Sequence, residues 1–168
     1  MHNRQNYLYV GVDLHKEHHT AVMINCWQEK LGEIQFDNKS SAFSKFLLEV
    51  ETYVSDGISV VFGLEDVGGY GRALAKYLVD HERVVKEVNP ALLFLERKSQ
   101  VMIPKNDSWD AECVARILVN KFEQTRCKAK RFILVDTTTS IKKECISKST
   151  KCVKESTTYS IKSPLSKL

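Results

Sequence analysis

The chain has 168 residues, of which 43% are hydrophobic and 27% charged, a globular balance that excludes wholesale disorder. Its length fits one ordinary domain with a small appendage. It has no apolar run of about 18 residues and no signal-peptide pattern at its polar N-terminus, so we expect a soluble, cytoplasmic protein without a membrane partner.

The first part of the chain predicts three strands and a helix. The strands are expected over residues 7–13, 19–26 and 32–38. Short polar or glycine-bearing links join them, which favours an antiparallel meander. Residues 41–54 then space their apolar side chains with a helical period, and Ser40 or Ser41 is the expected N-cap.

The middle of the chain alternates strands and helices. A nearly continuous apolar run predicts a central strand, buried on both faces, over residues 58–64. The elements expected after it are a helix over 70–79, a strand over 84–88, a helix over 91–97 that Asn89 and Pro90 begin, and a helix over 107–122. The order β-β-β-α-β-α-β-α-α predicts an α/β fold with a mixed sheet, in which helical crossovers join the parallel strands.

The composition changes near Cys127. Residues 1–126 carry 15 basic and 18 acidic side chains, whereas residues 127–168 carry 10 and 3, together with 13 Ser or Thr. We therefore expect a folded domain over 1–126 and a poorly structured, basic tail over 127–168, which disorder or a frameshift would explain. A tail of this kind is equally consistent with nucleic-acid affinity.

The cysteines and histidines show no metal-binding pattern of their own. Five cysteines, an odd number, include no CxxC pair, so we expect reduced thiols in the cytoplasm, with Cys113 buried as a small apolar side chain. His15, His18 and His19 lack further partners at zinc-site spacing and fit a polar turn, although His15 also adjoins the predicted metal edge beside Asp13.

Four carboxylates stand where a reaction could use them. Asp13 and Glu65 each end a predicted strand, so both reach the same sheet edge if those strands are parallel neighbours. Asp107 and Asp110 are close together on the inward face of the last helix. Singly, each acid is also explained as a turn residue or a first-turn helix acid. Together they predict an acidic pocket that fits Mg²⁺, and a pair of such ions can cleave phosphodiesters.

Several ordered motifs carry a resemblance to a known family. They are YVGVDLHK at 9–16, GLEDVGGYG at 63–71, Asn89-Pro90, and KNDSWDA at 105–111. Over residues 7–122 the chain resembles the DEDD transposases of the insertion-sequence one-ten group, which includes the Piv-type DNA invertases. The resemblance implies an RNase H-like, RuvC-type fold and a catalytic, Mg²⁺-binding tetrad formed by Asp13, Glu65, Asp107 and Asp110.

The same resemblance implies an enzyme. Its reaction would be the cleavage and strand transfer of DNA during transposition of an insertion sequence, with the element ends and the target DNA as partners. A structured RNA from the element would direct the enzyme to its DNA sites. Assembly into a homo-oligomer is a further possibility. Residues 123–168 match neither the long helical region nor the serine-bearing second domain of family members, so we expect an incomplete domain. The alternative is a catalytically inactive nucleic-acid-binding remnant.

Basic and glycine residues beside these motifs are candidates for nucleic-acid contacts. They are Lys16, Gly68, Gly69, Arg72 and Lys105. A lysine next to the first acid can meet a phosphate, and glycines before a helix let a nucleic-acid backbone approach closely. Lys76, Arg97 and Lys98 are further basic candidates, and all of these side chains are also explained as solvated surface. Asn106 and the pair Ser108-Trp109 depart from the family, which usually has threonine and a basic pair there.

Overall fold

The computed structural model describes residues 2–66, 68–99 and 106–127 of the chain. Six strands form one mixed sheet in the order β3-β2-β1-β4-β5-β6. The strands are β1 (Tyr7–Leu14), β2 (His18–Ile24), β3 (Lys30–Asp37), β4 (Ser59–Glu65), β5 (Val84–Glu87) and β6 (Arg126–Cys127). The helices are α1 (Ser40–Glu51), α2 (Arg72–Asp80), α3 (Pro90–Ser99) and α4 (Asp107–Lys121), with short 3-10 helices at Arg4–Asn6 and Phe122–Gln124.

The strand directions confirm the predicted mixed sheet. Strands β1, β2 and β3 form an antiparallel meander, while β4 lies parallel to both β1 and β5. The parallel pairs require crossovers, and α1 and α2 supply them, as the order of elements along the chain predicts. An antiparallel β1–β2–β3 edge followed by parallel β4 and β5 gives the chain an RNase H-like fold.

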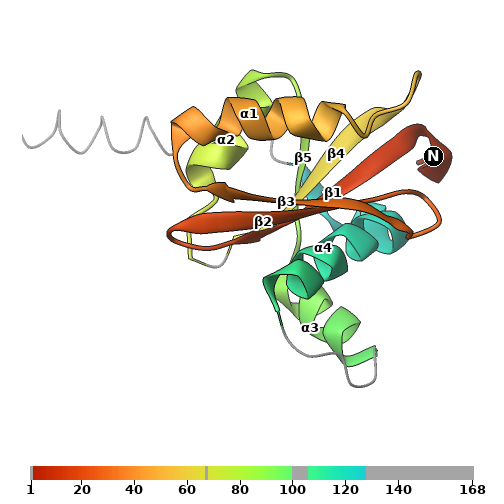
Figure 1. Ribbon diagram of the computed structural model, residues 1–168. Coiled ribbons are helices and arrows are strands. Elements are labelled where there is room, and N and C mark those ends of the chain that lie inside the picture. Colours follow the sequence, from red (N-terminus) through yellow and green to blue (C-terminus); the bar gives the residue numbers. More distant parts are fainter. Residues whose placement is uncertain (1, 67, 100–105, 128–168) are drawn as a thin grey trace, which may run out of the picture. The chain divides into compact units, whose positions relative to one another are not determined.

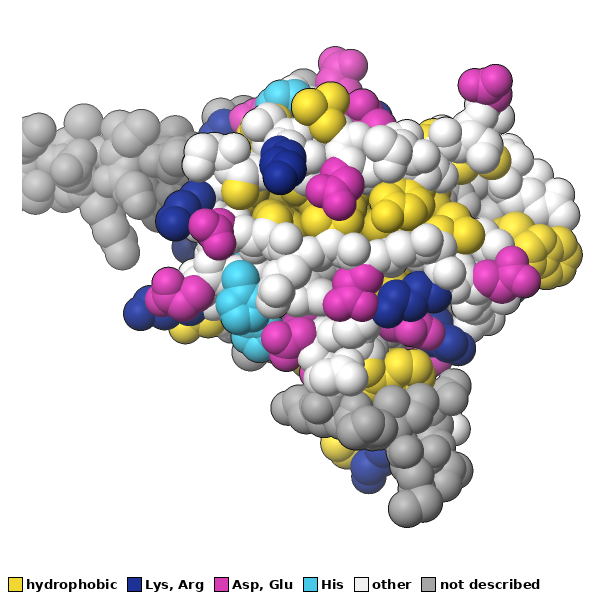
Figure 2. Space-filling model, in the orientation of Figure 1, with side chains coloured by type: hydrophobic (Ala, Val, Ile, Leu, Met, Phe, Trp, Pro, Cys, Tyr) yellow, Lys and Arg dark blue, Asp and Glu magenta, His cyan; other side chains and the backbone are white. Residues whose placement is uncertain are grey.

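Helices cover both faces of the sheet. Helices α1 and α2 lie on one face, and α4, with α3 beside it, lies on the other (Figure 1). Figure 2 shows the hydrophobic side chains that remain visible between α1 and the sheet edge below it. No helix in the described part of the chain has the length and apolar character needed to cross a membrane.

Helix α4 packs directly against β1 because β1 contributes a glycine to the contact. A Cβ atom at Gly11 would lie 2.1 Å from the backbone oxygen of Ala111 and 2.4 Å from the backbone nitrogen of Ala115. Only a residue without a side chain leaves the helix backbone that close to the strand. Gly11 and the small residues of α4 therefore place the start of this helix beside the end of β1.

Two local features differ from the predictions. Helix α1 begins at Ser40 with Lys39 as its N-cap and no side-chain cap hydrogen bond, so the predicted serine cap is wrong. Strand β6, which was not predicted, pairs with β5 through Lys86 and Cys127; two residues are too few to leave a periodic pattern. Cys127 therefore belongs to the sheet, whereas the rest of the predicted tail lies outside the described residues.

The cysteines in the described residues behave as expected. Cys26, Cys113 and Cys127 are free thiols. Cys113, on α4, is fully buried in the core, and burial raises the pKa of its thiol to about 12. Cys113 therefore serves as a small apolar side chain, as predicted from the character of a reduced cysteine.

Candidate metal centre

The parallel pairing of β1 and β4 brings two of the predicted acids together. Asp13 and Glu65 are register partners at the carboxyl ends of these strands. Only 9% of Asp13 is exposed, and Glu65 is half-buried. This is the edge at which open α/β sheets bind their ligands.

Burial and mutual repulsion raise the pKa values of both carboxyl groups. For Asp13 desolvation is the main cause, and the nearby charge of Asp110 adds to it while His15 opposes it. For Glu65 desolvation is again the main cause, Asp13 adds to it, and the Arg97 guanidinium opposes it. Desolvation and neighbouring carboxyl groups thus both disfavour the charged forms of Asp13 and Glu65, and a bound cation would favour them.

The first turn of α4 brings the other two acids to the same edge. The Oδ1 atom of Asn106 accepts a hydrogen bond of 2.7 Å from the backbone N–H of Trp109, which caps the helix immediately before Asp107. Asn and Thr are both favoured N-cap residues, so the departure at Asn106 preserves the cap. Asp110 is buried, as its inward position predicts, with 4% of the residue exposed. Asp107 is not buried: it is the first residue of the helix, and its side chain is 46% exposed.

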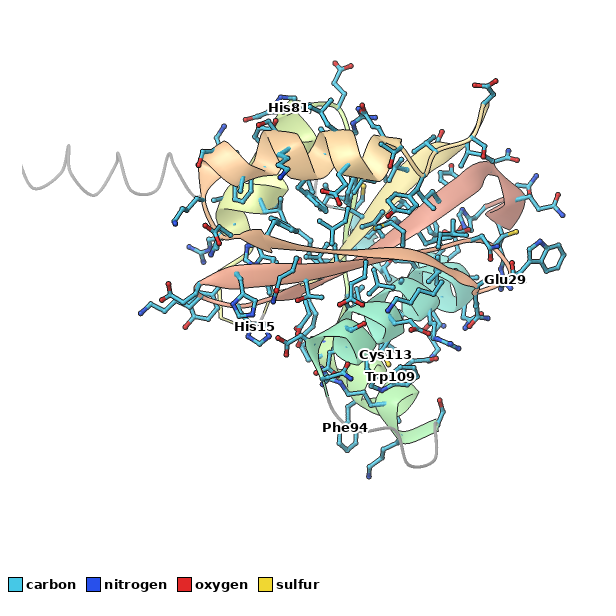
Figure 3. The ribbon with its side chains drawn as sticks, viewed as in Figure 1. His15, Glu29, His81, Phe94, Trp109 and Cys113 are labelled. Carbon is cyan, nitrogen blue, oxygen red and sulfur yellow. The ribbon has the colours of Figure 1, made fainter. Side chains whose placement is uncertain are left out.

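The side chain of His15 lies between the two sides of the site, which are the end of β1 with Asp13 and the start of α4 with Asp107. The Nε2 atom of His15 lies 3.0 Å from Oδ2 of Asp13 and 3.4 Å from Oδ1 of Asp107. One ligand atom from each of these three residues lies within 4.8 Å of the other two. His18 approaches the second oxygen of Asp107 at 3.5 Å. Figure 3 shows His15 at the end of the sheet, and Figure 2 shows histidine side chains beside acidic ones there.

The sequence offered one signal for His15 that the polar-turn interpretation missed. His15 follows Asp13 by two residues, and alternate residues of an extended chain point to the same side. The side chain of His15 therefore follows Asp13 towards the same edge, whereas a turn residue would point into solvent.

Arg97 also belongs to the site. Its Nε donates a hydrogen bond of 2.6 Å to Oδ1 of Asp110, and the guanidinium side chain is 34% exposed. The sequence suggested Arg97 as a phosphate contact. It did not predict the pairing with Asp110, because residue spacing does not show that α3 packs beside α4. A buried acid near a basic residue is the signal that could have found the pair, since buried charges are paired.

The donor atoms fit a divalent cation. Carboxylate oxygens are the ligands that Mg²⁺ and Mn²⁺ prefer, and the site supplies them from Asp13, Glu65 and Asp107. Asp110 adds a fourth carboxylate, which Arg97 engages in the described structure. The three segments that meet at this edge therefore provide an oxygen-rich site with one imidazole beside it.

The predicted nucleic-acid contacts in the described residues lie on two adjoining loops at this edge and at the start of α2. The Nδ2 atom of Asn38 donates to the backbone oxygens of Lys16, at 3.2 Å, and of Tyr70, at 3.3 Å, and so ties the loop after β1 to the loop before α2. Lys16 and Arg72 are exposed, and Gly69 has a positive φ of 75°, which favours glycine. Gly68 lies in the same exposed loop. Lys105 lies outside the described residues.

Comparisons with known proteins agree with these features. A family model of DEDD transposases of the insertion-sequence one-ten type, described as a transposase, matches residues 10–157. Pilin gene-inverting proteins from Moraxella lacunata and Moraxella bovis are each 28% identical over 110 residues, which is 64% of this chain. The aligned part is 33% of each relative, so the chain spans about a third of their length. The family match also extends beyond residues 7–122, whose motifs carry the resemblance.

Proposed function

Because this chain belongs to the DEDD transposase family, we propose that it provides an RNase H-like catalytic domain for the cleavage and strand transfer of DNA in transposition. One observation carries the proposal: Asp13 and Glu65 are register partners on parallel strands, at the edge where α4 brings Asp107 and the buried Asp110. The relatives are named as gene-inverting proteins, which fits a DNA rearrangement of this class.

We propose that Asp13, Glu65, Asp107 and Asp110 hold Mg²⁺, as two ions, and are the catalytic residues. When bound, these ions activate an attacking oxygen and stabilise a leaving one at a phosphodiester. The chain's own residues set the geometry for them. Gly11 lets α4 approach β1, and the Asn106 cap fixes the turn that carries the last two acids.

The loops beside the acids suit a polyanionic substrate. Lys16 and Arg72 are proposed to meet phosphates, and Gly68 and Gly69 to let a nucleic-acid backbone come close. Lys105 has the same proposed role from its sequence position. From the family resemblance we also propose that a structured RNA directs the protein to its sites, that the protein assembles as a homo-oligomer, and that it is located in the cytoplasm.

Calorimetry of the full chain with Mg²⁺ and Mn²⁺, together with a nicking assay on a DNA junction, tests the proposal. We expect Asp13→Ala and Asp107→Ala to abolish divalent binding and cleavage. The matched control is Asp80→Ala, because Asp80 is exposed at the end of α2 and pairs with Lys76. If the tetrad variants bind divalent ions as the unaltered chain does, the metal site is refuted. A chain that binds metal and DNA but never nicks supports the inactive remnant instead.

A further inference from the structure

One nitrogen atom of the His15 ring faces two carboxylate groups at once. A single atom, Nε2, faces an oxygen of Asp13 at 3.0 Å and an oxygen of Asp107 at 3.4 Å. Ionised carboxylates only accept hydrogen bonds, and an imidazole nitrogen carries at most one hydrogen. One hydrogen can at most be shared between the two oxygens, and each contact is then weaker than a linear hydrogen bond. A cation among the three atoms would accept a lone pair from each of them.

We infer that His15 is a ligand, through Nε2, of the cation that Asp13 and Asp107 hold. This ligand role rests on the proposed function and adds a nitrogen donor to the four acids. The three donor atoms come from the end of β1, the loop after it and the first residue of α4, and they lie within 4.8 Å of one another. His15 is accessible, since 44% of its side chain is exposed, so the ring can adjust to an incoming ion.

His18 has a different relation to the site and provides a matched control. Its Nε2 contacts Asp107 alone among the acids of the site, at 3.5 Å, and on the carboxylate oxygen that does not face His15. The two rings are similar in exposure, and their centroids are 5.4 Å apart. His18 therefore flanks the site, whereas His15 lies between its two sides.

A nitrogen donor changes which cation the site prefers. Mg²⁺ is bound through oxygen atoms, whereas first-row transition ions, Mn²⁺ among them, also accept an imidazole nitrogen. We therefore expect the chain to bind Mn²⁺ more tightly than Mg²⁺. The His15→Asp variant replaces nitrogen with oxygen, so the difference between the two affinities narrows. His15→Ala removes the donor, and Mn²⁺ affinity falls about tenfold or more.

Electron spin-echo envelope modulation of Mn²⁺ bound to the full chain tests this role directly, because it detects a nitrogen atom coordinated to the ion. We expect nitrogen modulation in the unaltered chain and in His18→Ala, and its loss in His15→Asp and His15→Ala. The His15→Asp variant keeps an oxygen ligand, so loss of the signal with Mn²⁺ still bound assigns the nitrogen to His15.

Each contrary outcome has its own meaning. Bound Mn²⁺ that Asp13→Ala abolishes, but without nitrogen modulation, overturns the ligand role of His15 and leaves the proposed function standing. Modulation that survives in both His15 variants also overturns it. If the chain binds no Mn²⁺, the proposed metal-dependent function fails, and the role of His15 fails with it.

Discussion

Arg97 donates from Nε to Oδ1 of Asp110 across 2.6 Å, so the most buried acid of the site meets a cation that the protein itself supplies. Asp110 is 4% exposed and lies on the face of α4 that packs against the sheet. A carboxylate this deeply buried requires an opposite charge. The guanidinium thus stabilises the site when no metal is bound, and it competes with metal for the same oxygen.

Removing that guanidinium should destabilise the metal-free chain. Breaking a buried ion pair costs about 3–5 kcal/mol, and because Arg97 is a third exposed, we expect about 2 kcal/mol for Arg97→Ala. Saturating Mg²⁺ should recover part of the loss, since it supplies the missing charge. Urea unfolding with and without Mg²⁺ measures both effects. Lys98→Ala is the control, because Lys98 lies over the Phe94 ring; an equal loss in the two variants contradicts the pairing.

A methyl group at Gly11 should separate α4 from β1. The added Cβ would meet backbone atoms of Ala111 and Ala115, which cannot rotate away, so we expect Gly11→Ala to cost about 3 kcal/mol or more. Gly63→Ala is the comparison: its Cβ would meet the Leu118 side chain at 2.8 Å, which can adjust. Thermal unfolding should show a larger loss of stability for Gly11→Ala than for Gly63→Ala, and divalent-ion titration a larger loss of affinity. Equal losses would mean that the helix does not depend on this contact.

The cap of α4 should tolerate threonine but not alanine. Asn106→Ala removes the oxygen that accepts from the Trp109 N–H and should cost about 1 kcal/mol. Asn106→Thr restores an N-cap oxygen and should stay within a few tenths of a kcal/mol of the unaltered chain. Chemical denaturation distinguishes the two. If both variants lose the same free energy, the cap does not hold the helix start.

His19 should make the fold sensitive to mild acid. Its ring is fully buried against Phe36, and burial lowers its pKa below the usual value of about 6.5. As the pH falls below about 6.5, His19 therefore becomes protonated in the unfolded chain but stays neutral in the folded chain. The free energy of unfolding then falls with a slope that approaches about 1.4 kcal/mol per pH unit.

Urea unfolding between about pH 7 and pH 5 measures this effect. The His19→Gln variant keeps a polar acceptor for the His15 backbone N–H, which now donates to Nδ1 at 3.3 Å, but it does not titrate in this range. The difference between the chain and the variant should grow as the pH falls. A constant difference would show that His19 titrates no differently in the folded state.

Much of the architecture could be predicted because its elements carry regular patterns. The apolar run of β4 and the helical spacing of α4 each reflect burial against a neighbour, so composition and period reveal them. The adjacency of Asp13 and Glu65 followed from one further step, since parallel strands end at a common edge. The bounds of β4 and α4 differ from the predicted ones by one residue, and those of the other elements by up to three, as helix and strand ends do when local signals are weak.

The missed features depend on tertiary contacts between segments. Arg97 and Asp110 meet because α3 packs beside α4, and no local period reports that packing. His15 reaches Asp107 only once α4 is seated on β1. The exposure of Asp107 likewise depends on where the helix begins relative to the sheet edge. The spacing of residues in the sequence predicts on which face of a helix or strand a side chain lies. Which residues that face contacts depends on the tertiary structure.

The seating of α4 on Gly11 also determines when the site can exist during protein synthesis. Strand β1 leaves the ribosome before the other strands of the sheet, and α4, which completes the group of acids, leaves only after four further strands and three helices. A nascent chain that ends before α4 carries Asp13 and Glu65 without their partners. The acids of this site therefore assemble only near the end of translation of the described region, so a partly made chain lacks the proposed metal site.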